Sequence, residues 1–150
     1  MPRCRLVSSA VSQPDDPPFR VMPALDPDNE FFWTSGKDGR LRFLRCQHCG
    51  YYVHPPVPIC PECLRREVAP EAVSGDATLW SYTVNHQAWA PGAEQPYVIG
   101  LVELAEQPGL RLTTNVLAAP EDVEIGMPVH VCFEDHDPVY IPLFEPKPAS

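Results

Sequence analysis

At 150 residues, the chain has room for one ordinary domain, or for a small metal module joined to one compact core. A hydrophobic content of 44% suffices for a core, but no apolar run approaches the roughly 18 residues that a membrane-spanning helix needs. The formal net charge of −9 argues against nucleic-acid binding, which depends on cationic contacts. The first residues hold no uninterrupted apolar segment, so we expect no signal peptide and a cytoplasmic protein.

Residues 1–23 are rich in proline and scattered polar residues, a composition that cannot bury a core. The sequence therefore predicts a flexible leader or linker over residues 1–23. We expect a helix and a metal-binding ribbon over residues 24–70, and a β-barrel over residues 71–150.

Residues 24–36 carry the signals of a short helix. Asp26 is a plausible N-cap, Pro27 suits the first helical position, and Gly36 supplies a stop. These signals predict a helix of about two to three turns. It would carry three adjacent aromatic residues, Phe31, Phe32 and Trp33. They either pack on the ribbon and the barrel or form a surface that docks a partner.

Residues 37–52 alternate as a hairpin, with a turn at Asp38-Gly39 and with Leu41 and Phe43 on one side. The segment that follows is stiffened by proline and leads to a second cysteine pair. Residues 64–75 are expected to form a connector.

Four cysteines have the spacing C-x2-C-x10-C-x2-C, namely Cys46, Cys49, Cys60 and Cys63. Each C-x-x-C pair places two sulfurs on one tight knuckle, and two knuckles facing each other give a tetrahedral tetrathiolate site. Such a site favours zinc or iron, and the first knuckle is similar to that of rubredoxin. We predict structural zinc, because nothing in the chain indicates an electron-transfer partner. A closed set of four thiolates leaves His48 and His54 without a place as ligands.

From residue 76 onward the pattern becomes β-rich. Five runs have strand composition and are separated by turn-forming residues, namely 78–84, 96–104, 111–117, 128–134 and 139–144. Residues 119–126 lie between the third and fourth runs and indicate a short helical or turn element. This order predicts a mainly β fold that ends in a five-stranded barrel of the OB type. A fragment of a β-sandwich is the alternative.

No complete catalytic set is recognisable in the sequence. His86, Trp89 and Tyr97 cluster around the first long loop of the barrel region. His130 and Cys132 share one face of the fourth barrel strand, but they lack the third, orienting group of a nucleophilic site. We interpret Cys132 as a buried packing residue.

The motifs together resemble the DUF35 family of acyl-CoA-associated proteins, which combine a rubredoxin-like zinc ribbon with an OB fold. The resemblance rests on FFW, GRLRFLRCQHCG, PPVPICPEC, GDATLWSYTV, PYVIGLVEL, EIGMPVHVCFE and IPLFEP, and covers residues 24–146. Val57 stands where the family pattern commonly has arginine. One branch of the family is similar to the C-terminal part of a steroid side-chain enoyl-CoA hydratase subunit.

The resemblance implies a non-catalytic subunit that binds a lipid-transfer-type aldolase of the thiolase fold and supports retro-aldol cleavage, in a heterotetramer. A hot-dog hydratase is another implied partner. The partner surface would include Phe31, Phe32, Trp33, His86 and Trp89. The alternative is an acyl-CoA-binding module that uses a basic patch of Arg40, Arg42, Arg65 and Arg66, with Lys37 and Arg45 nearby.

Overall fold

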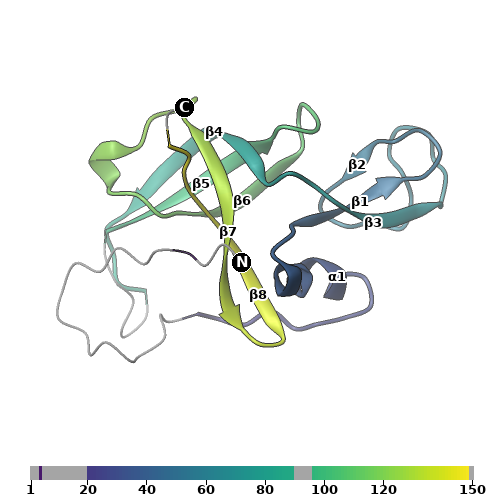
Figure 1. The fold of residues 1–150 in the computed structure, drawn as a ribbon, viewed down its shortest axis with the longest axis horizontal. Helices are drawn as coiled ribbons and strands as arrows, with labels where there is room; N and C mark the ends of the chain where they lie inside the picture. Colours follow the sequence, from purple (N-terminus) through teal and green to yellow (C-terminus); the bar gives the residue numbers. More distant parts are fainter. Residues whose placement is uncertain (1–3, 5–19, 90–95, 149–150) are drawn as a thin grey trace.

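A computed structural model describes Cys4, residues 20–89 and residues 96–148. A small three-stranded sheet lies beside a closed five-stranded barrel, with one short α-helix next to both (Figure 1). The prediction of a mainly β fold with a zinc-ribbon region and an OB-type barrel is confirmed. Within the described residues, no helix is long and apolar enough to cross a membrane.

The described residues form one α-helix, two 3₁₀ helices and eight strands. In chain order they are α1 (Glu30–Trp33), the 3₁₀ helix η1 (Ser35–Asp38), β1 (Arg42–Cys46), β2 (Tyr52–Val53), β3 (Val68–Ala72), β4 (Asp76–Asn85), β5 (Tyr97–Leu104), β6 (Arg111–Val116), the 3₁₀ helix η2 (Pro120–Asp122), β7 (Pro128–His136) and β8 (Val139–Pro146).

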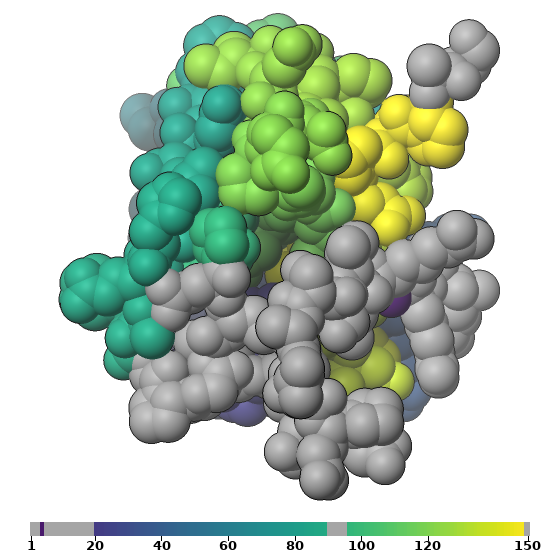
Figure 2. Space-filling model, turned by 90° about the vertical axis from the view of Figure 1, so that its left-hand side faces the viewer, coloured from purple at the N-terminus to yellow at the C-terminus, as the bar shows by residue number. Residues whose placement is uncertain are grey.

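The barrel contains all five predicted strands in the order β4-β5-β6-β8-β7, and β4 pairs with β7 to close it. All pairs are antiparallel except β6 with β8. Figure 2 shows one side of this barrel, with the teal residues of β4 and β5 at its left edge. The single closed sheet excludes the sandwich alternative, because a sandwich needs two facing sheets.

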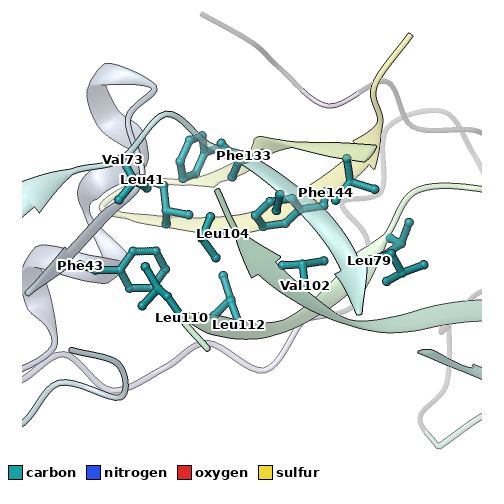
Figure 3. Close-up of a cluster of buried hydrophobic side chains, with 14 of the residues drawn as sticks. Leu41, Phe43, Val73, Leu79, Val102, Leu104, Leu110, Leu112, Phe133 and Phe144 are labelled. Atoms are coloured by element: carbon teal, nitrogen blue, oxygen red, sulfur yellow. The ribbon is translucent and has the colours of Figure 1, made fainter. Parts of the chain in front are cut away.

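Alternation along the strands fills the barrel. In β5 every second residue from Val98 to Leu104 is buried, which places these side chains on the inner face. Gly100 is one of them, and a Cβ there would lie 2.6 Å from Val116 and 2.9 Å from Leu79. The core continues to Phe43 of β1, so the ribbon sheet and the barrel share one hydrophobic cluster (Figure 3).

The predicted helix is much shorter than expected. Asp26 accepts hydrogen bonds from the amides of Asp28 and Asn29, but α1 begins only at Glu30 and gives way to η1 after one turn. The tighter 3₁₀ turn brings Gly36 against the barrel, where a Cβ would lie 2.5 Å or less from Phe133 and Tyr140. Packing against the barrel therefore overrides the local helix signals.

The hairpin predicted for residues 37–52 has its turn at a different position. Asp38 ends η1 and Gly39 caps it with a φ of 75°, so this pair precedes the sheet. The turn between β1 and β2 is instead the first cysteine knuckle. The expected connector over residues 64–75 contains β3, which pairs with the whole of β1. Leu41 and Phe43, which were predicted to share one side, both belong to the hydrophobic core.

Two described residues of the N-terminal segment are tied to the outer face of β7. Cys132 is buried, as interpreted from the sequence, but it is not only a packing residue, because it forms a disulfide with Cys4. Arg20 makes a bidentate ion pair with Glu134, at 2.9 and 3.2 Å. Burial would raise the pKa of Glu134, but hydrogen bonds from Arg20 and His136 outweigh it and lower that pKa. The other residues of the predicted leader up to residue 19 lie outside the described part of the chain.

Candidate metal centre and partner surfaces

Two similar knuckles carry the four cysteines. In the first, the amide of Gly50 donates to the carbonyl of Cys46, and Gly50 adopts a φ of +79°. In the second, the amide of Leu64 donates to the carbonyl of Cys60, and Leu64 adopts a φ of 61°. Glycine takes this left-handed backbone easily, whereas a leucine takes it only at a cost. The tight turn after the second cysteine of each pair therefore fixes the direction of its sulfur.

The four sulfurs form one compact cluster. All lie within 4.8 Å of one another, with 3.5 Å between Cys46 and Cys63 and 3.6 Å between Cys49 and Cys60. Zinc–sulfur bonds of about 2.3 Å in a tetrahedron place the sulfurs about 3.8 Å apart. The residues present therefore fit a tetrathiolate zinc ion, which would tie both knuckles together.

The electrostatics of the four cysteine sulfurs also favour a bound cation. Backbone amides of Cys49 and His48 donate to the sulfur of Cys46 and lower its pKa to about 6. The amide of Arg65 likewise favours the thiolate of Cys63, but burial and the neighbouring sulfurs outweigh it and raise that pKa to about 12. Four thiolates at these distances repel one another, and a divalent cation between them removes the repulsion.

Neither nearby histidine joins the sulfur cluster among the described residues. His54 instead packs between two aromatic rings, with its centroid 5.4 Å from that of Phe32 and 4.9 Å from that of Phe43. Burial lowers the pKa of His54 to about 4. His54 is therefore neutral at neutral pH and packs, half-buried, against the edge of the core.

The pH dependence of stability should report on His54. Because the pKa falls from 6.5 unfolded to about 4 folded, the unfolded chain binds the extra proton between these values. The contribution of His54 is therefore complete above pH 6.5 and decreases by about 3 kcal/mol as the pH falls toward 4. Urea unfolding of zinc-loaded protein should show this slope for the wild type and for His86→Gln, an exposed control. His54→Phe should show a smaller slope, because the zinc thiolates still take up protons in all three proteins. An unchanged slope in that variant would contradict the assignment.

The predicted basic patch is only partly available. Arg42 makes a bidentate ion pair with Asp38, whose pKa its hydrogen bonds lower to about 2. Arg45 binds Glu71 and the carbonyl of Gly50, so it braces the first knuckle. Among the described residues, four cations are exposed and have no ion pair, namely Lys37, Arg40, Arg65 and Arg66.

A pocket of about 220 Å³ lies between the ribbon and the turn that joins β5 to β6. Tyr52, His54 and Gln107 are among its lining residues, and none of the arginines of the patch is. The Gln107 side chain accepts from the amide of Tyr52 and donates to its carbonyl, so it holds the ribbon to the barrel. A pocket of this size, without cationic lining, does not suit the whole of an acyl-CoA.

The predicted partner residues fall into two groups. Phe32 is buried in the core, and Phe31 and Trp33 pack against it, so the aromatic helix closes the core. His86 and Trp89 are exposed at the end of β4. Sequence reasoning missed the exposed Trp80 and Tyr82 of β4. The step from the buried Leu79 to Trp80 was an available signal, but a β-bulge between Leu79 and Ser81 ends the alternation before Tyr82.

His130 and Cys132 do not form a nucleophilic pair. The Nδ1 atom of His130 lies 2.7 Å from a carboxylate oxygen of Asp76, and the other oxygen accepts from Lys147 at 2.8 Å. The sulfur of Cys132 is bonded to Cys4. Both side chains are therefore engaged in structural contacts.

Family models match most of the chain in two adjacent parts. Residues 33–69 match the rubredoxin-like zinc ribbon domain of ChsH2, and residues 70–134 match the C-terminal OB-fold domain of ChsH2. Two curated relatives are similar over 130 residues, or 85% of this chain. A probable enoyl-CoA hydratase alpha subunit of Thermomonospora curvata is 40% identical, and a 3-oxo-4,17-pregnadiene-20-carboxyl-CoA hydratase alpha subunit of Mycobacterium tuberculosis is 37% identical. The match spans about 40% of the length of each relative.

Solved structures agree with the family models. The solved structure of an Ltp2-ChsH2(DUF35) aldolase contains a chain that is 39% identical, with a TM-score of 0.75 over 83% of this chain and 98% of that one. A DUF35 protein of unknown function from Sulfolobus solfataricus shares the fold, with 20% identity and a TM-score of 0.58 over 81% of this chain and 86% of that one. The chain therefore belongs to the DUF35 family of the ChsH2 type, with a rubredoxin-like zinc ribbon whose four cysteines are positioned to bind a metal ion.

Proposed function

We propose that the chain is a non-catalytic accessory subunit of a thiolase-fold aldolase of the lipid-transfer type. Its partner would act on acyl-CoA intermediates of steroid side-chain degradation, and the complex would carry out retro-aldol cleavage. The observation that carries this proposal is the likeness to a chain of the Ltp2-ChsH2(DUF35) aldolase, 98% of which this chain covers. A curated relative named for a steroid carboxyl-CoA substrate supports the same pathway class.

The site chemistry is consistent with an accessory role. A zinc ion held by four thiolates has no open position for substrate or water, so it would stabilise the ribbon and activate nothing. The reactive side chains of the fourth barrel strand are engaged with Asp76 and with Cys4. The contribution of this chain to the reaction would therefore be to bind the catalytic subunit and order its active site.

The test is reconstitution with a purified aldolase of the Ltp2 type. Light scattering should give the mass of a complex with two copies of each chain. Retro-aldol cleavage of a β-hydroxyacyl-CoA with a steroid side chain should require both proteins. Activity in this chain alone would overturn the accessory role, and two proteins that stay apart would overturn the choice of partner.

A hot-dog hydratase is a second candidate partner. The observation that favours it is that both curated relatives are named as hydratase alpha subunits and are more than twice as long as the matched part. Co-purification of this chain with a hot-dog hydratase, but not with the aldolase, would favour this alternative.

A further inference from the structure

We propose that the exposed aromatic strand β4 and its continuation to Trp89 form the surface that docks the aldolase subunit. We call residues 79–89 and 96–102 the β4–β5 arm. The proposal rests on the proposed function and adds the location of the interface. It also replaces the predicted partner contacts of Phe31, Phe32 and Trp33, because these residues pack in or against the core.

The arm carries large aromatic side chains in solvent. Trp89 is 72% exposed, Trp80 is 49% exposed and Tyr82 is 36% exposed. Tryptophan and tyrosine are the residues that most often dominate binding energy in protein interfaces. At the turquoise end of β4 in Figure 2, the chain stands out at the left edge of the molecule, where a partner can reach it.

The arm is also free of charge. The sequence has 20 acidic and 11 basic residues, yet the exposed described residues of the arm include no Asp, Glu, Lys or Arg. The charges of Arg111 and Glu103, which lie beside Trp80, pair with each other. The centres of protein interfaces are depleted of charged residues in this way, whereas single-stranded nucleic acid needs cations beside its stacking rings. The exposed Leu64 of the ribbon, by contrast, is followed by the exposed Arg65 and Arg66. A protein surface of low charge is therefore the occupant that fits the arm.

The two exposed tryptophans are held in place by other side chains. The indole nitrogen of Trp89 donates to the side-chain oxygen of Asn85 at 2.9 Å. The guanidinium of Arg111 lies 3.9 Å over the ring of Trp80, and Glu103 holds that guanidinium at 2.9 Å. Rings that are ordered before binding lose less conformational freedom when a partner arrives. Their fixed positions therefore suit them as anchors.

The backbone of the arm also has a free edge. Strand β4 pairs with β7 only from Asp76 to Thr78, and Leu79 bonds to the loop before β7. Beyond Leu79, the described residues give β4 a partner only on the side of β5. An open edge is a template for added backbone hydrogen bonds. Trp80 lies on this edge strand and Trp89 follows its end by four residues, so one partner segment can engage the anchors and the edge.

The test compares arm variants with a matched variant on the ribbon. Trp80→Ala and Trp89→Ala remove the anchors, Asn85→Ala releases Trp89 without removing it, and Leu64→Ala removes an exposed apolar side chain elsewhere. Affinity for a purified Ltp2-type aldolase is measured by calorimetry, after circular dichroism has shown that each variant is folded. Both tryptophan variants should bind at least about 30-fold more weakly, and Leu64→Ala should bind like the wild type.

The outcomes separate this proposal from the proposed function. If the wild type binds and the tryptophan variants bind equally well, the arm is not the interface, but the accessory role stands. If Leu64→Ala alone weakens binding, the ribbon is the interface. If the arm variants abolish only self-association, the occupant is a second copy of this chain. If the wild type does not bind the aldolase, the proposed function fails first.

Discussion

Cys46→Ser should abolish metal binding and unfold the ribbon. Cys46 is buried, it ends β1, and its sulfur lies 3.5 Å from that of Cys63. Structural zinc stabilises small zinc modules by an apparent 10–16 kcal/mol or so at neutral pH, far more than one residue's packing contributes. Metal analysis by mass spectrometry should fall from one zinc per wild-type chain to none. Thermal unfolding should show a lowered or missing transition for the ribbon.

The loss of zinc and of stability should result from the missing sulfur and not from a change in the knuckle backbone. Leu64→Gly is the matched control, because it changes the other knuckle, keeps all four thiols and suits the φ of 61°. This variant should bind one zinc and unfold at about the wild-type temperature. A folded Cys46→Ser protein with a full complement of metal would show that the ligand set is different. If the wild type contains iron, the four cysteines remain the ligands, but the assignment of the metal as zinc is wrong.

Sequence reasoning predicted the metal site because its information is local. Two C-x-x-C pairs define two knuckles whatever the rest of the chain does. The five barrel strands have strand composition and are bounded by turn-forming residues, so each could be recognised separately. The partner residues depended instead on tertiary packing. Nothing in the order of Phe31, Phe32 and Trp33 indicates that one ring enters the core and the other two pack against it.

Long-range pairs escaped prediction for the same reason. Cys4 and Cys132 are 128 residues apart, so their spacing contains no information about a disulfide. Arg42 was assigned to a basic patch, although its partner Asp38 lies only four residues before it. That pair was within reach of sequence reasoning. It was missed because the residues were placed in a hairpin, where the two side chains would not face each other.

Phe43→Ala should strongly lower the free energy of unfolding. Phe43 is fully buried, and its ring lies 5.9 Å from that of Phe32 and 4.9 Å from that of His54. It comes from β1 of the ribbon but belongs to the same cluster as the barrel residues Leu110 and Leu112 (Figure 3). Truncating such a ring costs about 3–5 kcal/mol, because the lost contacts leave a cavity. Since the cavity lies where the ribbon meets the barrel, both should lose stability together.

Urea unfolding of the zinc-loaded protein measures this loss. Phe43→Leu is the matched control, because leucine keeps most of the apolar contact and should cost less than half as much. Both variants should keep one zinc per chain, since the four sulfurs are unchanged. If the ring joins the ribbon to the barrel, the transitions of the two parts should shift together in Phe43→Ala. A shift confined to the ribbon would show that the barrel is stable without this contact.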